Sequence, residues 1–143
     1  MPESGPDIVN ALTIDVEEYF HVTNLAAAVR PEDWAGLASS VRPNTERLLD
    51  LLAEAGVSAT FFVLGWVAER DPALVRQIHA QGHEVACHGY SHELVHAMSP
   101  ETFRDDRRRA RSLLEDLTGE AVAGYRAPSW SITPWALDIL AEE

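Results

Sequence analysis

Acidic, imidazole and guanidinium side chains occur where three apolar segments of the chain end. Asp15 and Glu17 lie at the end of one segment, His88 and His92 follow a later one, and Arg126 follows a third. Histidine and carboxylate groups are common zinc ligands, and a carboxylate can also act as a general base that a nearby guanidinium keeps ionised. These residue types therefore indicate metal-assisted or acid–base chemistry if the fold brings the segments together.

The apolar pattern predicts four strand–helix units that would position these groups. Apolar runs favour strands over 8–16, 59–64, 84–87 and 121–125, and the continuous run at 59–64 suggests burial on both faces. Four helices are expected to begin at N-capping residues and to run to about 55, 81, 119 and 143; these capping residues are Asn44, Asp71, Ser99 and Thr133. The alternation predicts an α/β fold with a parallel sheet, in which functional groups gather at the carboxyl ends of the strands.

The number of units bears on the domain organisation. A complete (β/α) barrel typically needs about 250 residues and eight units. The last expected helix is still apolar near its end and reaches Glu143 without a capping residue. We therefore expect residues 1–143 to be the N-terminal part of a larger catalytic domain, truncated at the C-terminus.

Among the six histidines, three pairs have a spacing of four: His79/His83, His88/His92 and His92/His96. Spacing alone therefore does not identify ligands. His79 and His83 precede the third expected strand, whereas His88 and His92 follow it on the same side as the carboxylates. Position therefore favours His88 and His92, with His96 as an alternative to one of them.

Several of these side chains also have simpler interpretations. Asp15 and Glu17 could be a solvated strand end, and Arg126 could be a surface ion-pair partner. Other prominent side chains are interpreted structurally: the tryptophans and the cysteine as packing residues, and the arginine-rich stretch as the solvated face of its helix. They are Trp34, Trp66, Trp135, Cys87, Arg104, Arg107, Arg108, Arg109 and Arg111.

Composition excludes several classes of protein. The 143 residues carry a net charge of −12, which argues against a nucleic-acid-binding surface. The longest nearly apolar run, 59–68, is about half of a membrane span, and the first ten residues lack the features of a secretion signal. Cys87 is the single cysteine, which excludes an internal disulfide. The sequence therefore predicts a soluble, cytoplasmic protein without a transmembrane segment.

The three motifs together resemble a known family. Asp-Val-Glu at 15–17, His-x-x-x-His at 88–92 and Arg-Ala-Pro at 126–128 are similar, in this order, to the first three motifs of the polysaccharide deacetylases, the NodB-like members of carbohydrate esterase family four. The segment LTIDVEEYFHV at 12–22 most resembles the branch associated with exosortase and exopolysaccharide loci.

The resemblance implies a distorted (β/α) barrel that uses a divalent metal, most often Zn²⁺, to hydrolyse N-acetyl amides of sugars. Asp15 matches the catalytic base, His88 and His92 match metal ligands, and Arg126 matches the residue that holds the base. The backbone N–H of Ser129 matches an oxyanion donor.

Two departures from the family pattern matter. Most members have a second aspartate where this chain has Val16, so the carboxylate ligand is expected to be Glu17, which shares the strand face of Asp15, while Glu18 should point with Val16 to the opposite side. The motifs that supply the acid histidine and part of the acetate pocket have no counterpart before Glu143.

The expected activity is hydrolysis of carbon–nitrogen, non-peptide bonds in an N-acetylated polysaccharide or oligosaccharide, such as an exopolysaccharide. A metal with open coordination positions would polarise the acetyl carbonyl and activate water. Two alternatives are a metal-independent, allantoinase-like cyclic-amide hydrolase and a non-catalytic glycan-binding relic.

Overall fold

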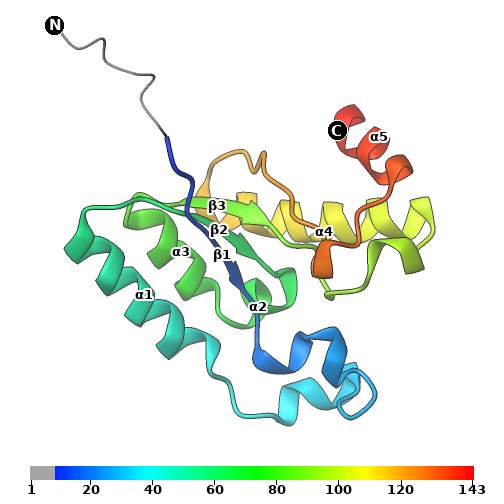
Figure 1. Cartoon of the computed structure of the whole chain (residues 1–143), viewed down its shortest axis with the longest axis horizontal. Helices are drawn as coiled ribbons and strands as arrows, with labels where there is room; N and C mark the ends of the chain where they lie inside the picture. The colour runs from blue at the N-terminus through cyan, green and yellow to red at the C-terminus, as the bar shows by residue number, and fades with distance from the viewer. Residues whose placement is uncertain (1–8) are drawn as a thin grey trace, which may run out of the picture.

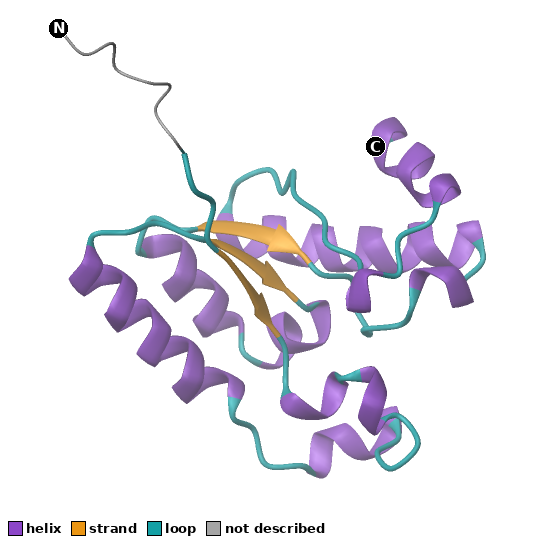
Figure 2. Cartoon of the chain, in the orientation of Figure 1, coloured by secondary structure: helices purple, strands orange, loops and turns teal. Residues whose placement is uncertain are grey.

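A small parallel sheet organises the chain (Figure 2). The computed structural model describes residues 9–143. Its sheet has the order β1-β2-β3, with β1 at Thr13–Val16, β2 at Thr60–Val63 and β3 at Glu84–Cys87. Both pairs of neighbouring strands are parallel. Their carboxyl ends therefore meet at one edge of the sheet.

Helices connect the strands and pack beside the sheet (Figure 1). They are α1 (Val41–Ala55), α2 (Gly65–Arg70), α3 (Pro72–Ala80), α4 (Pro100–Thr118) and α5 (Pro134–Glu142). Short 3₁₀ turns occupy the loops: η1 (Tyr19–His21), η2 (Thr23–Leu25), η3 (Pro31–Gly36), η4 (Val95–Ala97) and η5 (Pro128–Trp130). The predicted caps Asp71, Ser99 and Thr133 each accept a backbone N–H from the first turn of α3, α4 and α5.

The first predicted strand and helix have different bounds in the structure. The strand expected over 8–16 begins only at Thr13, and its first residue lies outside the described residues. Helix α1 begins at Val41, and Ser40 occupies its N-cap position without a capping hydrogen bond from its side chain, so the prediction that Asn44 is the cap is wrong. Pro43 fits inside this helix because the N–H groups of the first turn need no intrahelical acceptor.

The strand expected at 121–125 is reduced to one bridge, between Cys87 and Tyr125. Cys87 N donates to Gly124 O and Arg126 N donates to Cys87 O, both at 2.9 Å. A Cβ on Gly124 would lie 2.9 Å from the Cβ of Ala86, so glycine allows this close approach. The bridge suffices to bring Arg126 beside β3.

Helix α2 was not predicted, because its six residues are too few to show a helical period. It begins at Gly65, whose N–H donates to Gly89 O at 2.8 Å. A Cβ at Gly65 would lie 2.5 Å from Tyr90 Cδ2. This contact places α2 directly against the loop that follows β3.

The two faces of the sheet differ in burial. Phe61 and Val63 are fully buried in the main core, whereas Thr60 and Phe62 on the other face are only half-buried. The prediction that β2 is buried on both faces is therefore wrong for the described residues. The less buried face carries Phe62 and Asp15 at the same register position.

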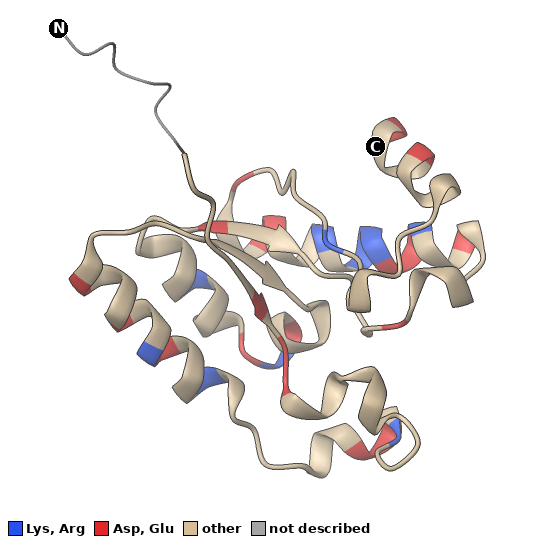
Figure 3. Cartoon of the chain, in the orientation of Figure 1, with Lys and Arg blue, Asp and Glu red and all other residues tan. Residues whose placement is uncertain are grey.

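One arginine departs from the expected solvated face of α4. Arg107 is buried and pairs with the carboxylate of Glu143, which Arg104 and Arg108 also contact. Figure 3 shows basic residues along α4, the helix against which α5 packs. Arg109 differs from these three arginines because it pairs with Glu69 of α2. The expectation for Cys87 agrees with its position, because burial raises the pKa of this thiol to about 12.

The predicted fold class, an α/β architecture of parallel strands alternating with helices, is confirmed. Within the part of the chain that the structure describes, no helix is long and apolar enough to cross a membrane.

Candidate active site

Asp15 is held by Arg126 on the less buried face of the sheet. Arg126 donates from Nη1 to Asp15 Oδ1 at 2.5 Å and from Nη2 to Thr13 Oγ1 at 2.7 Å. Its guanidinium also lies over the ring of Phe62, with Cζ 4.1 Å from the ring centroid. Hydrogen bonds and stacking together fix the guanidinium, so one oxygen of Asp15 is fixed as well.

His88 follows β3, and its ring is oriented by the backbone of Arg126. Its Nδ1 donates to the carbonyl oxygen of Arg126 at 2.9 Å. Nε2 is therefore the nitrogen that faces the carboxylates, 3.9 Å from Asp15 Oδ2 and 3.7 Å from Glu17 Oε2. Burial lowers the pKa of His88, which favours the neutral imidazole, the form that binds metals.

Glu17, His88 and His92 converge on one point. Glu17 Oε2 lies 2.7 Å from His92 Nε2, and one ligand atom from each of the three residues lies within 4.8 Å of the others. Burial raises the pKa of Glu17, but its contact with His92 and the nearby imidazoles outweigh burial and lower it. Among residues 9–143, Glu17 Oε2 is buried without a partner in hydrogen-bond geometry. An ionised buried oxygen beside two imidazoles fits a divalent cation.

Glu18 has a different role from its neighbour. Glu18 is 1% exposed, and its carboxylate accepts the N–H of Ser40 at 2.9 Å and is bonded by the hydroxyl of Ser39. Figure 3 shows acidic residues at the end of β1. The side chains of the two glutamates have different partners, because Glu17 contacts His92 whereas Glu18 is bonded by Ser39 and Ser40. The structure thus places Glu17, and not Glu18, beside the two histidines.

All six predicted site residues line one pocket of about 190 Å³: Asp15, Glu17, His88, His92, Arg126 and Ser129. Three residues of this pocket, His92, Ser129 and Trp130, have positive φ angles of 58°, 49° and 56°. Such left-handed conformations in non-glycine residues are costly and cluster at functional sites. The Ser129 hydroxyl is also bonded to that of Thr23 at 2.9 Å.

Asp106 supports the histidine loop and was not predicted. From α4 it accepts the N–H groups of Tyr90 at 2.8 Å and Ser91 at 3.3 Å, and the Ser91 hydroxyl at 3.1 Å. The arginine-rich stretch of this helix predicts a solvated face, and Asp106 lies within that stretch. The local sequence around Asp106 does not indicate a contact with Tyr90 and Ser91, which precede it by 16 and 15 positions.

His21 is a second residue that was missed. It is 4% exposed, its Nδ1 accepts the N–H of Glu18 at 2.9 Å, and its ring is stacked near His92 with centroids 6.4 Å apart. Burial lowers the pKa of His21 to about 4. The sequence shows this histidine after β1, but no spacing relates it to the 88–92 pair.

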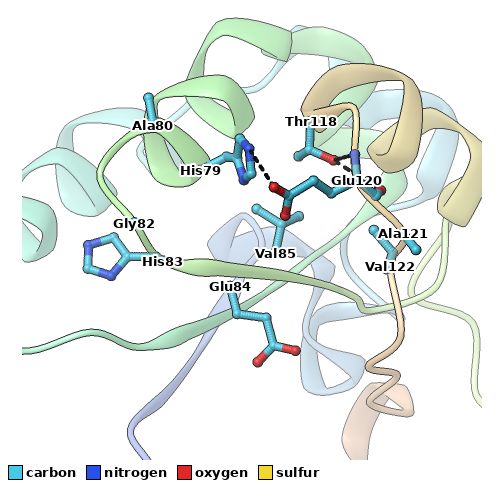
Figure 4. Close-up of a pocket in the computed structure, with 10 residues that line it drawn as sticks. All are labelled: His79, Ala80, Gly82, His83, Glu84, Val85, Thr118, Glu120, Ala121 and Val122. Atoms are coloured by element: carbon cyan, nitrogen blue, oxygen red, sulfur yellow. Dashed lines mark hydrogen bonds and ion pairs between the residues drawn. The ribbon is translucent and has the colours of Figure 1, made fainter.

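The remaining candidate histidines lie elsewhere. His79 and His83 line a cavity of about 620 Å³ beside the amino end of β3 (Figure 4). There His79 Nε2 is 4.0 Å from Glu120 Oε1, and His83 Nδ1 accepts the N–H of Ala59 at 3.2 Å. His96 is exposed on η4. None of the three belongs to the carboxylate–histidine cluster found in the described residues.

Fold and site define an α/β protein whose candidate catalytic groups lie at the carboxyl ends of parallel strands. The polysaccharide deacetylase family model matches residues 33–142. The chain therefore belongs to the polysaccharide deacetylase family, as the three motifs indicated.

Relatives of known activity cover part of the chain. The chain is 39% identical over 87 residues to a peptidoglycan deacetylase of Helicobacter pylori, and the aligned region covers 61% of this chain and 30% of the relative. It is 32% identical over 97 residues to a chitooligosaccharide deacetylase of Bradyrhizobium sp., covering 68% and 43%. A solved peptidoglycan N-acetylglucosamine deacetylase superposes with a TM-score of 0.72 at 26% identity, over 92% of this chain and 51% of that one. The chain thus spans less than half the length of both curated relatives.

Proposed function

We propose that the chain is the N-terminal part of a metal-dependent polysaccharide N-deacetylase domain. The observation that carries the proposal is the convergence of Glu17, His88 and His92 next to the Asp15–Arg126 pair. Family membership supports hydrolysis of an N-acetyl amide, and the names of the two curated relatives describe deacetylation of peptidoglycan and of chitooligosaccharides. An exopolysaccharide or a related glycan is the proposed substrate.

In this proposal Glu17, His88 and His92 hold a divalent ion, for which Zn²⁺ suits two imidazoles and one carboxylate. When bound, such an ion supplies Lewis acidity that polarises an acyl carbonyl and acidifies water. Asp15 accepts a proton from the attacking water, and Arg126 keeps Asp15 ionised and oriented. The backbone N–H of Ser129 donates to the oxygen that becomes negative in the tetrahedral intermediate.

Hydrolysis and metal content test this proposal together. The full-length gene product should contain zinc, release acetate from N-acetylglucosamine oligomers, lose that activity on chelation and regain it when zinc is restored. Hydrolysis of a cyclic amide without stoichiometric metal would favour the allantoinase-like alternative. Glycan binding without acetate release from the zinc-loaded protein would favour the non-catalytic alternative.

Removing the Asp106 carboxylate should weaken metal binding without touching a ligand. In Asp106→Ala the partly buried N–H groups of Tyr90 and Ser91 lose their acceptor, so the loop between the two histidines is held less firmly. Changes in groups that orient metal ligands typically reduce affinity by about 10–100-fold. Competition with a zinc-binding dye measures the effect.

Asp105→Ala is the matched control, since Asp105 is the exposed neighbour on the same helix. Asp106→Asn, which retains one acceptor oxygen, should recover part of the affinity. Equal zinc affinity in Asp106→Ala and Asp105→Ala would show that the loop holds its histidines without this carboxylate.

The cytoplasmic location stays a prediction. The proposed domain assignment for residues 1–143 is supported by the family match to residues 33–142 and by the position of Asp15 and Glu17 in the common pocket.

A further inference from the structure

The short segment Pro128–Trp130 has a backbone conformation that its own residues do not favour. Ser129 has φ 49° and ψ 32°, and Trp130 has φ 56°. Two successive non-glycine residues are thus left-handed, which is unfavourable because the Cβ of each lies close to the following carbonyl oxygen. Such a conformation persists only where contacts with the surrounding structure hold it. The contacts of this segment therefore show what fixes the backbone of Ser129.

The two flanks of the segment are bonded to β3 and to the chain that follows β3. On one side, Arg126 N donates to Cys87 O at 2.9 Å. On the other side, Ser131 Oγ accepts the N–H of Val95 at 2.8 Å. These bonds hold the flanks, but neither of them involves Ser129.

The side chain of Ser129 is bonded to the opposite side of the site. Its Oγ lies 2.9 Å from Oγ1 of Thr23, a residue 106 positions earlier in the chain. Thr23 is the first residue of η2, in the loop that follows β1. Its neighbour Val22 lines the same pocket as Ser129 and Asp15. The bond therefore joins the loop after β1 to the segment that contains Ser129, beside the proposed catalytic base.

The main-chain N–H of Ser129 is the proposed oxyanion donor. The next two N–H groups along the chain donate to Ala127 O and Pro128 O, at 3.2 and 3.1 Å. Within residues 9–143, the N–H of Ser129 donates to no other protein atom. Because both flanks of the segment are held, a change in φ at Ser129 has to be compensated at its neighbours, which turns the peptide plane that carries this N–H. The orientation of the donor therefore depends on the contact that fixes Ser129.

We propose that Thr23 is a positioning residue for this donor. Its hydroxyl holds Ser129 in the left-handed conformation in which the N–H donates to the developing oxyanion. Thr23 lies outside the three motifs and acts through Ser129, so it need not touch the substrate. The proposal rests on the proposed function and deepens it, because it makes the loop after β1 a determinant of the rate of hydrolysis.

Thr23→Val tests the proposal, since it removes the hydroxyl and keeps the branched shape of the side chain. In the zinc-loaded full-length protein, kcat for acetate release from N-acetylglucosamine oligomers should fall by about 3- to 10-fold, the size that the loss of one hydrogen bond allows. KM and zinc affinity should change little, because an oxyanion donor acts mainly on the transition state. Thr23→Ser, which keeps the hydroxyl, should restore kcat.

Thr102→Val is the matched control. Thr102 Oγ1 lies 3.1 Å from Ser99 Oγ, so this variant breaks the same kind of exposed hydroxyl pair at the start of α4 and should keep the wild-type kcat. Ser129→Ala removes the other half of the Thr23 bond, so the double variant Thr23→Val/Ser129→Ala should lose no more kcat than Ser129→Ala alone. Additive losses would overturn the proposal, because they would show that the two side chains act independently.

A structural measurement separates this proposal from the proposed function. The ¹³Cα and ¹³Cβ chemical shifts of Ser129 depend on its φ and ψ angles. They should move in the zinc-free full-length Thr23→Val protein and stay unchanged in Thr23→Ser and Thr102→Val. Unchanged shifts in Thr23→Val, or moved shifts without a fall in kcat, would overturn the proposal. Failure of the zinc-loaded wild-type protein to release acetate would contradict the proposed function, whereas the shifts of Ser129 would still decide whether Thr23 holds its backbone.

Discussion

Asp15→Asn is expected to keep the metal cluster intact and to reduce kcat by about 10²–10⁴-fold, the usual loss when a general base is removed. The amide is nearly isosteric, so its oxygen can still accept from Arg126 Nη1, as Asp15 Oδ1 does now. It cannot accept a proton from water. The structure separates this function from metal binding, because Glu17 is the carboxylate that contacts His92.

Acetate release and zinc content should be measured on the same Asp15→Asn preparation. Asp116→Asn, at an exposed position of α4, makes the same chemical change away from the pocket and should behave as wild type. Activity of Asp15→Asn within about tenfold of wild type would assign the base to another residue.

Loss of either imidazole at 88 or 92 should abolish stoichiometric zinc binding. His88→Ala and His92→Ala each remove one of three proposed ligands and leave the charge of Glu17 without one of its neighbours. The expected fall in zinc affinity exceeds about 100-fold, because changing a group that only orients a metal ligand already lowers affinity by about 10–100-fold. Elemental analysis after dialysis at controlled free zinc measures it.

His79→Ala and His96→Ala are the matched controls for these two variants. His79 lies beside the amino end of β3, and His96 is exposed on η4. Both should retain zinc. Stoichiometric zinc in His92→Ala, with a normal circular dichroism spectrum, would show that the ligand set has been assigned wrongly.

Local sequence was informative where a short segment determines its own structure. The caps at Asp71, Ser99 and Thr133 depend on a side chain and a backbone N–H only three residues apart, so the sequence predicted them. Strand alternation likewise predicted that Asp15 and Glu17 would share a face. The location of the six site residues in one pocket followed from a general property of parallel sheets.

Contacts between distant segments could not be predicted in this way. Asp106 reaches the histidine loop from a helix whose charge pattern resembles that of an ordinary solvated surface. His21 packs near His92 across 71 positions of the chain. The last expected strand depended on how closely Gly124 approaches Ala86, and the apolar pattern of 121–125 carries no information about that distance.

Arg126 contributes to the site through two chemically independent parts. Its side chain binds Asp15, whereas its main-chain carbonyl fixes the tautomer of His88. Substitution at this position alters only the first of these, because every amino acid brings the same carbonyl. Side-chain mutagenesis will therefore underestimate the contribution of Arg126. Substitutions at this position during evolution can change the environment of Asp15 while the imidazole of His88 keeps its orientation. Replacing the peptide bond after Arg126 by an ester, which weakens the carbonyl as an acceptor, would reveal the other half.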